Sequence, residues 1–254
     1  RDRQLDKRYP FVMADALYTR VRENGRIRSK GFMVAVGINE QGYREILGFS
    51  CADSETEAGW TTFFRELKGR GLSQVDMVIS DSHKGLVKAV KQCFQGAAWQ
   101  RCQTHFSRNM LDVCPKKLHP EMKAALKSLY EAGDYETAVL LRDNILLRFQ
   151  QEAPKAAALL EESFEDVMAV LSLPYAMRRR LRTTNGIERL NEEIRRRERV
   201  IRIFPNEESL SRLIGALLME INDGWQSGKV YLDLNAYLAQ QPLVDKPATQ
   251  RSVA

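Results

Sequence analysis

Three acidic residues stand where a carboxylate needs an explanation: Asp15, Asp81 and Glu188. Asp15 lies inside an apolar stretch between Ala14 and Ala16, where an acid must be paired, exposed or bound to a cation. Asp81 follows "VDMVIS", where a short strand gives way to a helix, and Glu188 lies in the first turn of an arginine-rich helix. Three hard oxygen ligands suit Mg²⁺ or Mn²⁺, and a pair of such ions can promote phosphoryl transfer.

Each acid also has an ordinary structural interpretation. Asp81 is suited to cap the helix that follows it, and Asp15 to a solvent-facing position on an edge strand. Asn185 is a plausible N-cap with Glu188 three residues later, which is a looser form of the capping box, and a negative side chain there suits the helix dipole. Composition and periodicity alone do not show that the three acids meet.

The composition favours a folded protein with polyanionic partners. The chain has 254 residues, of which 44% are hydrophobic, with a net charge of +6 and a pI of about 9.2. The sequence has no apolar run of membrane-spanning length and no signal-peptide pattern. Four cysteines in a chain this long do not make a disulfide framework, so a reducing cytosol is the expected location. The start without methionine suggests the middle of a longer protein.

The positive charge is concentrated in "RRRLRTTNGIERLNEEIRRRERVIR", residues 178–202. Clustered arginine along a helix is typical of phosphate contacts with nucleic acid. We take Arg195, Arg196 and Arg199, which lie in this cluster, as candidates for contacts to phosphate groups. The alternative is a solvated helix face with Glu–Arg pairs, since Glu192 and Arg196 are four residues apart.

Residues 1–104 predict the first part of an α/β core. Three β-rich runs, with Gly42 in the turn between the last two, suggest an antiparallel meander over about residues 9–52. A helix capped by Ser54 and ended by Gly69 and Gly71 follows, and then come the strand "VDMVIS", the helix "SHKGLVKAVKQCF" and the strand "AAWQRCQ". The glycine-rich phosphate-binding motifs are missing and the first strands lack crossover helices, which argues against a dinucleotide-binding fold.

The second half of the chain is predicted to be helical. Residues 105–182 predict an all-helical insertion, residues 183–236 closing helices of the core, and residues 237–254 a flexible tail. Asn206 is expected to cap a closing helix with a core stripe of Leu210, Leu213, Ile214, Leu217 and Leu218. Aromatic burial favours a core position for all three tryptophans, Trp60, Trp99 and Trp225.

Four stretches together resemble the signature blocks of Mutator-type bacterial insertion-sequence transposases. They are "ADALYTRVRENGRIRS", "VISDSHKGL", "RCQTHFSRNML" and "TTNGIERLNEEIRRRERVIRIFPNEESLSRL", in the family order, and they cover roughly residues 9–230. The resemblance implies an α/β, RNase H-like mixed sheet with an all-helical insertion before the final catalytic helix. It also implies a D-D-E triad of Asp15, Asp81 and Glu188 that binds two Mg²⁺ (or Mn²⁺) ions. Glu192 and Glu193 are rivals for the third position, and Glu188 is preferred because it follows "TTNGI" directly.

"RCQTH" supplies Cys102 and His105, the C-x-x-H element of the family that the chain resembles. Alone this is half a zinc site, and only Cys114 and His119 offer a weak second half. We expect His105 near the catalytic pocket, where it contacts DNA phosphate or orients an acid, and Cys102 in packing. His83, two residues after Asp81, either meets the scissile phosphate or faces solvent at the helix start.

The resemblance implies DNA strand cleavage and strand transfer at the ends of a mobile element. Water attacks first and frees a 3′-hydroxyl, which then attacks a second phosphodiester without a covalent protein intermediate. The implied partners are double-stranded DNA, as terminal inverted repeats and target, and at least one further protomer on that DNA, in the bacterial cytoplasm at the nucleoid and without a membrane. Two alternatives remain: a hydrolytic nuclease on the same fold, and a catalytically silent or domesticated DNA-binding derivative.

Overall fold

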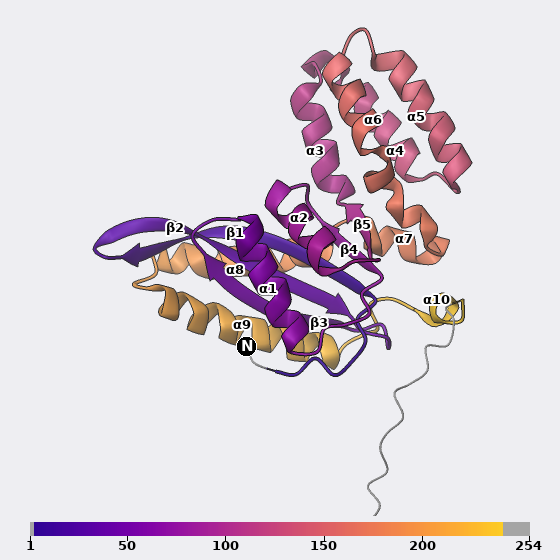
Figure 1. Cartoon of the computed structure of the whole chain (residues 1–254). Helices are drawn as coiled ribbons and strands as arrows, with labels where there is room; N and C mark the ends of the chain where they lie inside the picture. The colour runs from indigo at the N-terminus through magenta and orange to yellow at the C-terminus, as the bar shows by residue number, and fades with distance from the viewer. Residues whose placement is uncertain (1–2, 241–254) are drawn as a thin grey trace, which may run out of the picture.

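A mixed five-stranded sheet is the centre of the structure, a computed structural model that describes residues 3–240 (Figure 1). Its strands are β1 (Phe11–Glu23), β2 (Arg26–Ile38), β3 (Arg44–Ala52), β4 (Met77–Ser80) and β5 (Ala98–Arg101). The order is β3-β2-β1-β4-β5, in which the first three strands are antiparallel and β4 and β5 run parallel to β1. The predicted meander is confirmed, and the whole arrangement is the RNase H-like mixed sheet that the sequence predicts.

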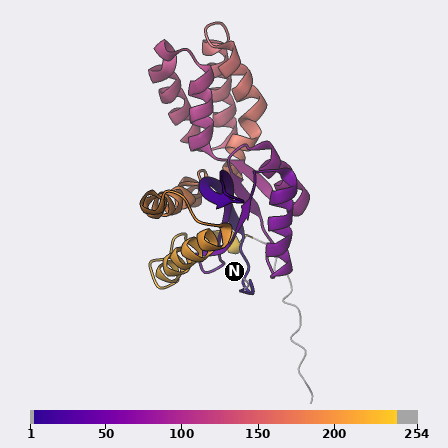
Figure 2. The ribbon, with the colours of Figure 1, turned by 90° about the vertical axis from the view of Figure 1, so that its left-hand side faces the viewer.

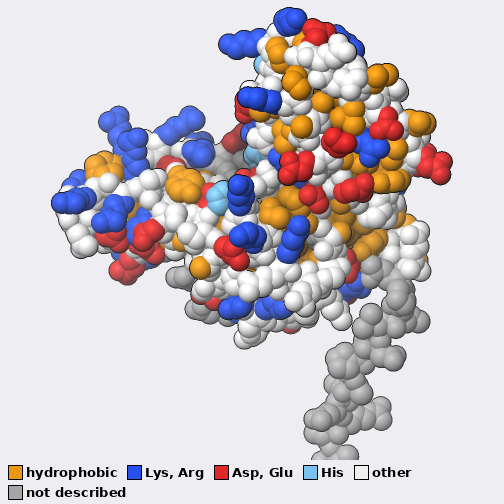
Figure 3. Space-filling view, turned by 45° about the horizontal axis from the view of Figure 1, so that its top comes forward, with side chains coloured by type: hydrophobic (Ala, Val, Ile, Leu, Met, Phe, Trp, Pro, Cys, Tyr) orange, Lys and Arg blue, Asp and Glu red, His pale blue; other side chains and the backbone are white. Residues whose placement is uncertain are grey.

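The β1–β2 hairpin is longer than the sequence pattern suggested, with 13 residues in each strand. Asn24 and Gly25 both take positive φ angles, 50° and 74°, which is the tight hairpin turn that Asn-Gly favours. The far end of the hairpin projects from the body of the molecule, and Figure 3 shows Lys and Arg side chains gathered over this projecting end. The Phe204 backbone anchors the hairpin, because its amide donates to the Arg20 carbonyl and its carbonyl accepts from the Arg22 amide.

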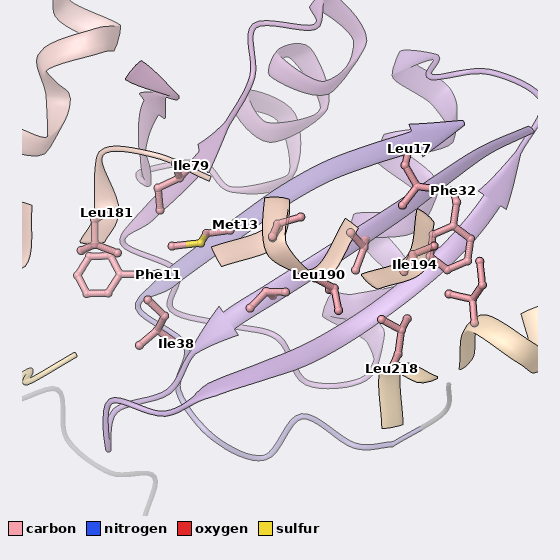
Figure 4. Close-up of a cluster of buried hydrophobic side chains, with 14 of the residues drawn as sticks. Phe11, Met13, Leu17, Phe32, Ile38, Ile79, Leu181, Leu190, Ile194 and Leu218 are labelled. Atoms are coloured by element: carbon pink, nitrogen blue, oxygen red, sulfur yellow. The ribbon is translucent and has the colours of Figure 1, made fainter. Parts of the chain in front are cut away.

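Helices cover both faces of the sheet (Figure 2). One face carries α1 (Glu57–Gly69) and α2 (Lys84–Cys93), and the other carries α8 (Asn185–Ile201) and α9 (Glu207–Gln226). Side chains of β1 alternate between these layers. Phe11, Met13 and Leu17 pack toward α8 and α9 (Figure 4), whereas Val12 and Ala14 pack toward α1 and α2. By the same alternation Asp15 belongs to the α8 face.

A separate helical block lies between β5 and α8, as predicted (Figure 1). It contains α3 (Gln103–Val113), α4 (His119–Tyr130), α5 (Tyr135–Phe149), α6 (Pro154–Met168) and α7 (Tyr175–Leu181), with short 3₁₀ turns at Lys116–Leu118 and Ala169–Ser172. The block has its own buried cluster around Phe106, Phe149 and Phe164. The first helix begins two residues before the predicted start at 105, and the domain boundaries themselves stay predictions.

Two of the predicted helix caps are wrong and one is confirmed. Thr56, not Ser54, caps α1, because its hydroxyl accepts a hydrogen bond from the Gly59 amide at 3.0 Å. Asn185 is the first residue of α8 rather than its N-cap, and the preceding Thr184 makes no side-chain cap. Asn206 does cap α9, with its side-chain oxygen 2.8 Å from the Ser209 amide.

The remaining predictions about burial hold with three exceptions. Leu213 is 39% exposed at the edge of the α9 stripe, whereas Leu210, Ile214, Leu217 and Leu218 are buried. Trp60 is fully buried, but Trp99 and Trp225 are only partly buried against the two sheet cores.

The four cysteines, all among the described residues, form no disulfide, and no helix within residues 3–240 is long and apolar enough to cross a membrane. The predicted tail at 237–254 begins inside the short helix α10 (Asn235–Leu238), and from residue 241 it lies outside the described residues.

Candidate active site

Asp15 projects from the central strand of the sheet toward α8. Asn191 of α8 donates its side-chain amide to Asp15 Oδ2 at 2.9 Å, and the Ala16 amide donates to Oδ1 at 2.9 Å. The pairing of β4 with β1 ends at Met13, so Asp15 lies just beyond it, and its carboxylate is directed to α8 rather than into open solvent.

Asp81 lies beside Asp15 at the end of the neighbouring strand. Met13 of β1 pairs with Ile79 of β4, and each aspartate follows two residues beyond that pair on parallel strands. The expected structural role of Asp81 as a helix N-cap is not observed, because His83 is the N-cap of α2. The Asp81 carboxylate instead accepts from the His83 amide at 3.1 Å in the loop before the helix.

Glu188 approaches from the first turn of α8. Its Oε1 atom lies 4.0 Å from His105 Nε2 and is buried without a hydrogen-bond partner among the described residues. Asn191, which holds Asp15, follows three residues later on the same face of α8. The rivals of Glu188 are directed elsewhere, because Glu192 is exposed and Glu193 pairs with Arg196 at 2.7 Å. Helix α8 therefore carries both Glu188, which lies beside His105, and Asn191, which is bonded to Asp15.

The C-x-x-H element fastens the helical block to this point of the sheet. Cys102 is buried directly before α3, and its sulfur accepts from the Thr184 amide at 3.4 Å and hydroxyl at 3.3 Å. This contact joins the start of α3 to the start of α8 and places His105 beside Glu188. The expected packing role of Cys102 and the expected position of His105 agree with the geometry. Figure 3 shows histidine and acidic side chains together in the recess between the projecting hairpin and the helical block.

These groups are electrostatically linked. Burial and the negative charge of Asp81 raise the pKa of Asp15 to about 7, although the His105 charge opposes the shift. Contact with the Cys102 thiol, together with the charges of Asp15 and Asp81, raises the pKa of His105 to about 9. A cluster of acids around one cationic imidazole is a site with a strong attraction for further positive charge.

Glu55 is a fourth acid of the site that the sequence analysis missed. It follows β3, and its Oε2 atom lies 3.9 Å from His83 Nδ1. Burial and the charge of Asp81 raise the pKa of Glu55, although His83 opposes the shift, and Glu55 in turn contributes to the raised pKa of Asp15. Gly85 lets the starts of α1 and α2 approach this closely, since a Cβ atom there would lie 2.7 Å from the Glu57 amide nitrogen.

No sequence signal separates Glu55 from the acids around it in "ADSETE". Asn191 was also missed, because an asparagine in the middle of a helix has no pattern of its own. Both residues become visible only when the sheet brings their elements to Asp15.

The donor set fits Mg²⁺ or Mn²⁺ in chemistry, since it consists of carboxylate oxygens and includes the unpartnered Glu188 Oε1. The described side chains do not enclose a preformed ion site, because no three acidic, histidine or cysteine residues converge closely enough within residues 3–240. The weak zinc alternative is not formed either. His119 Nε2 lies 3.0 Å from the Cys114 carbonyl oxygen rather than at its thiol.

The predicted DNA contacts lie on exposed surface. Arg195, Arg196 and Arg199 project from α8 into solvent. Arg196 forms its ion pair with Glu193 rather than with Glu192. His83 is also exposed, and His105 is partly buried. The DNA-binding roles of these five residues stay predictions.

The fold is an RNase H-like mixed sheet with a helical block between β5 and α8. The family model "Transposase, Mutator family" matches residues 1–228. The chain belongs to this family, as the four signature stretches predict.

Curated transposases are similar over most of the chain. Residue identity is 43% to the transposase of insertion sequence IS256 in transposon Tn4001 from Staphylococcus aureus, covering 91% of this chain and 60% of that protein. It is 40% to the IS1081 transposase of Mycobacterium tuberculosis, covering 99% and 62%. The chain thus spans about 60% of the length of these relatives.

Among solved structures, the HTLV-2 integrase catalytic core domain in complex with magnesium overlaps 50% of this chain and 88% of its own, with 14% identity and a TM-score of 0.26. A superposition this loose assigns no function.

Proposed function

We propose that this chain is the catalytic domain of a DDE transposase that cleaves DNA strands at mobile-element ends and joins them to target DNA. The observation that supports the proposal is that His105 interacts electrostatically with Asp15 and Asp81 and lies 4.0 Å from Glu188, in a chain of the Mutator family. The chain spans about 60% of the length of its relatives. The activity of the whole protein is therefore also part of this proposal.

Asp15, Asp81 and Glu188 would hold two Mg²⁺ or Mn²⁺ ions. When bound, such ions supply activation of the attacking oxygen and stabilisation of the charge on the leaving oxygen. The need for a divalent cation is part of this proposal: burial and the charge of Asp81 raise the pKa of Asp15, and a divalent cation would favour its charged form.

The other side chains of the site orient the acids and balance part of their negative charge. Asn191 fixes the orientation of Asp15 through a single hydrogen bond. His105 carries its positive charge beside Glu188, where it can face a phosphate oxygen or hold the glutamate in place. Water frees a 3′-hydroxyl at the element end, and this hydroxyl attacks the target phosphodiester in line, without a covalent link to the protein.

We propose double-stranded DNA as the partner, as element ends and target, with at least two protomers assembled on it. We also propose a place at the bacterial nucleoid, where both DNA substrates occur. Arg195, Arg196 and Arg199 remain our candidates for backbone contacts along α8.

The Asp81→Asn variant tests the chemistry. We expect it to lose strand transfer by at least ~10²-fold, as for removal of a group that stabilises transition-state charge. The assay follows labelled duplexes with an element end in Mg²⁺ and separates cleaved from joined products. Unchanged circular dichroism and DNA affinity would show that the fold is intact.

Full strand transfer by the Asp81→Asn variant would remove Asp81 from the chemistry. Cleavage without joined products in the wild type would favour a hydrolytic nuclease. DNA binding without either product would favour a catalytically silent derivative.

A further inference from the structure

Four arginines line one hollow beside the start of α8. The hollow has a volume of about 400 Å³. We call it the arginine pocket, and it is lined by Arg44, Arg179, Arg180 and Arg189 together with Thr183, Asn185, Gly186 and Tyr231. These residues come from the start of β3, from α7, from the start of α8 and from the segment after α9, so the pocket exists only in the folded chain.

The positive charge of the arginine pocket is uncompensated. Among the described residues, none of the four guanidinium groups forms an ion pair or a hydrogen bond to a carboxylate. Burial and the positive charges of Arg180 and Arg189 lower the pKa of Arg44, which is the sign of repulsion between the groups. Like charges held together without a counterion destabilise a fold, and an anion in the pocket would remove that cost.

The pocket is also rigidly built. The Arg44 guanidinium lies 4.1 Å from the ring centroid of Trp225 and 4.4 Å from that of Tyr231, and Arg180 lies 4.9 Å from the Tyr231 centroid. Backbone amides of Tyr231 and Leu232 donate to the Gly42 carbonyl at 3.0 and 3.1 Å, which fixes this segment on the β2–β3 turn.

Gly186 lines the pocket, and the nearest neighbour of a Cβ atom there would be the core residue Met13, with its sulfur at 3.3 Å. A Cβ atom at this position would lie 3.6 Å from the Tyr231 hydroxyl and 3.7 Å from Arg44 Nη1. The pocket also takes in the amino-terminal end of α8, where Thr184 makes no side-chain cap. Free backbone amides at a helix start add to the attraction for an anion.

A second hollow beside the arginine pocket favours a phosphate of a nucleic-acid strand over a free phosphate ion as the ligand. This second hollow, lined by Gln103, Thr104, Ser107, Tyr130 and Arg182, shares Arg179, Thr183 and Asn185 with the arginine pocket. A single phosphate occupies one hollow, whereas a nucleic-acid strand places successive phosphates along both. Glu188 and Arg189 are adjacent on α8, so the strand in the pocket lies next to the carboxylates.

We propose that the arginine pocket binds a backbone phosphate of the DNA strand whose neighbouring phosphodiester lies at the carboxylates. The inference rests on the proposed function for the identity of the nucleic acid as substrate. It adds a contact on α7, β3 and the start of α8 that anchors the strand beside the reacting phosphate.

The test compares Arg180→Ala and Arg189→Ala with the matched control Arg212→Ala. Arg180 and Arg189 are exposed, so their removal leaves the buried core intact, although Arg180→Ala also removes a contact with the Tyr231 ring. Arg212 is an exposed arginine on α9 paired with Glu208 at 3.1 Å. Fluorescence anisotropy with a short duplex is measured over a series of salt concentrations. Each pocket variant is expected to weaken binding and to lower the slope of log Kd against log salt by about one. The control is expected to match the wild type.

A competition arm with inorganic phosphate separates the two sources of the ligand. We expect millimolar phosphate to leave DNA binding unchanged beyond the effect of equal ionic strength. Pocket variants with wild-type affinity and slope would overturn the proposal. The proposal would also be overturned if inorganic phosphate bound the wild-type protein but not the pocket variants, while the pocket variants bound DNA as tightly as the wild type.

Failure of this inference is distinct from failure of the proposed function. If the pocket variants bind DNA normally while Asp81→Asn still abolishes joining, the phosphate contact is wrong and the chemistry stands. If Asp81→Asn joins strands normally while the pocket variants lose DNA affinity, the phosphate contact stands and the proposed role of Asp81 in the chemistry is wrong.

Discussion

The two flanks of α8 carry clusters of opposite charge, and neither cluster is compensated from within. On one flank lie Asp15, Asp81 and Glu188, with the His105 imidazole near all three. On the other flank, the arginine pocket has no acid among the described residues. Adjacent positions on one helix, Glu188 and Arg189, thus face a site that attracts cations and a site that attracts anions. A phosphodiester with its divalent ions is a ligand that satisfies both.

A third charged group shows what a structural acid looks like in the same fold. Glu45 of β3 has a fully buried side chain, yet Arg3 and Lys7 pair with it at 2.9 and 2.7 Å. Although burial opposes the shift, hydrogen bonds from Lys7, Asn39 and Tyr9 lower the pKa of Glu45. Asp15 has two neutral donors, the Asn191 side chain and the Ala16 amide, but no lysine or arginine pairs with it among the described residues, and burial and the charge of Asp81 raise its pKa. Cationic partners therefore distinguish Glu45 from Asp15.

The largest effect is expected from removing the charge of Glu188, on the acidic flank of α8. We expect Glu188→Gln to reduce strand transfer by at least ~10²-fold, because it removes a charged ligand of the proposed ions while keeping the shape of the side chain. Since Glu188 has no structural hydrogen bond, the thermal stability should stay close to that of the wild type. Labelled element-end duplexes in Mg²⁺ measure the activity.

Glu192→Gln is the matched control on the same helix. Glu192 is exposed and lies one turn further on, so its variant should stay within about twofold of the wild type. If Glu192→Gln were inactive and Glu188→Gln active, the third acid would have been assigned to the wrong turn of α8.

A smaller effect is expected at Glu55, which borders the acid cluster without belonging to the proposed triad. Glu55→Gln removes one negative charge near Asp15 and Asp81. We expect Mg²⁺ affinity to fall on the order of tenfold, as for groups behind metal ligands, with the rate at saturating Mg²⁺ unchanged.

A Mg²⁺ titration of the strand-transfer rate measures both quantities for Glu55→Gln. Glu57→Gln is the control, since Glu57 is exposed and pairs with Lys88 at 3.3 Å. An equal shift in both variants would mean that Glu55 acts only through the general charge of the surface.

The smallest expected effect is a pH dependence of stability in the metal-free protein. The pKa of Asp15 rises from 3.8 to about 7 on folding, so its protonation stabilises the fold fully below pH 3.8, and this contribution is lost as pH rises through 7. The pKa of His105 rises from 6.5 to about 9, so its contribution is likewise lost as pH rises through 9. Both groups make the metal-free protein less stable at alkaline pH.

Mg²⁺ should therefore raise the melting temperature more at about pH 8 than at about pH 6, where Asp15 retains its proton. Thermal denaturation with and without MgCl₂ checks this, and the Asp15→Asn variant should lose most of the difference between the two pH values. An equal shift at both pH values would place the Mg²⁺ effect outside the carboxylate cluster.

The fold was predictable from local patterns, whereas the site was predictable mainly from the resemblance. Alternating apolar residues and glycine turns give the meander and the helical block directly. The periodicity of α8 indicates a helix but not which of Glu188, Glu192 and Glu193 faces the sheet. That choice depends on how α8 packs on β1, which the bond from Asn191 to Asp15 now fixes.

Other features depended on contacts between distant elements and had no local signal. Thr184 at the Cys102 sulfur, Glu55 beside His83, and Arg44 between Trp225 and Tyr231 all join segments far apart in the chain. The Asn24-Gly25 turn was readable in principle, because Asn-Gly between β-rich runs is a strong hairpin signal.

The most direct test is a crystal of the protein soaked in MnCl₂, with anomalous diffraction recorded to locate manganese. We expect anomalous density among the carboxylates of Asp15, Asp81 and Glu188, and none in a matched crystal of the Asp81→Asn variant. Manganese bound elsewhere, or three carboxylates that stay apart with no metal between them at saturating Mn²⁺, would contradict a shared metal site.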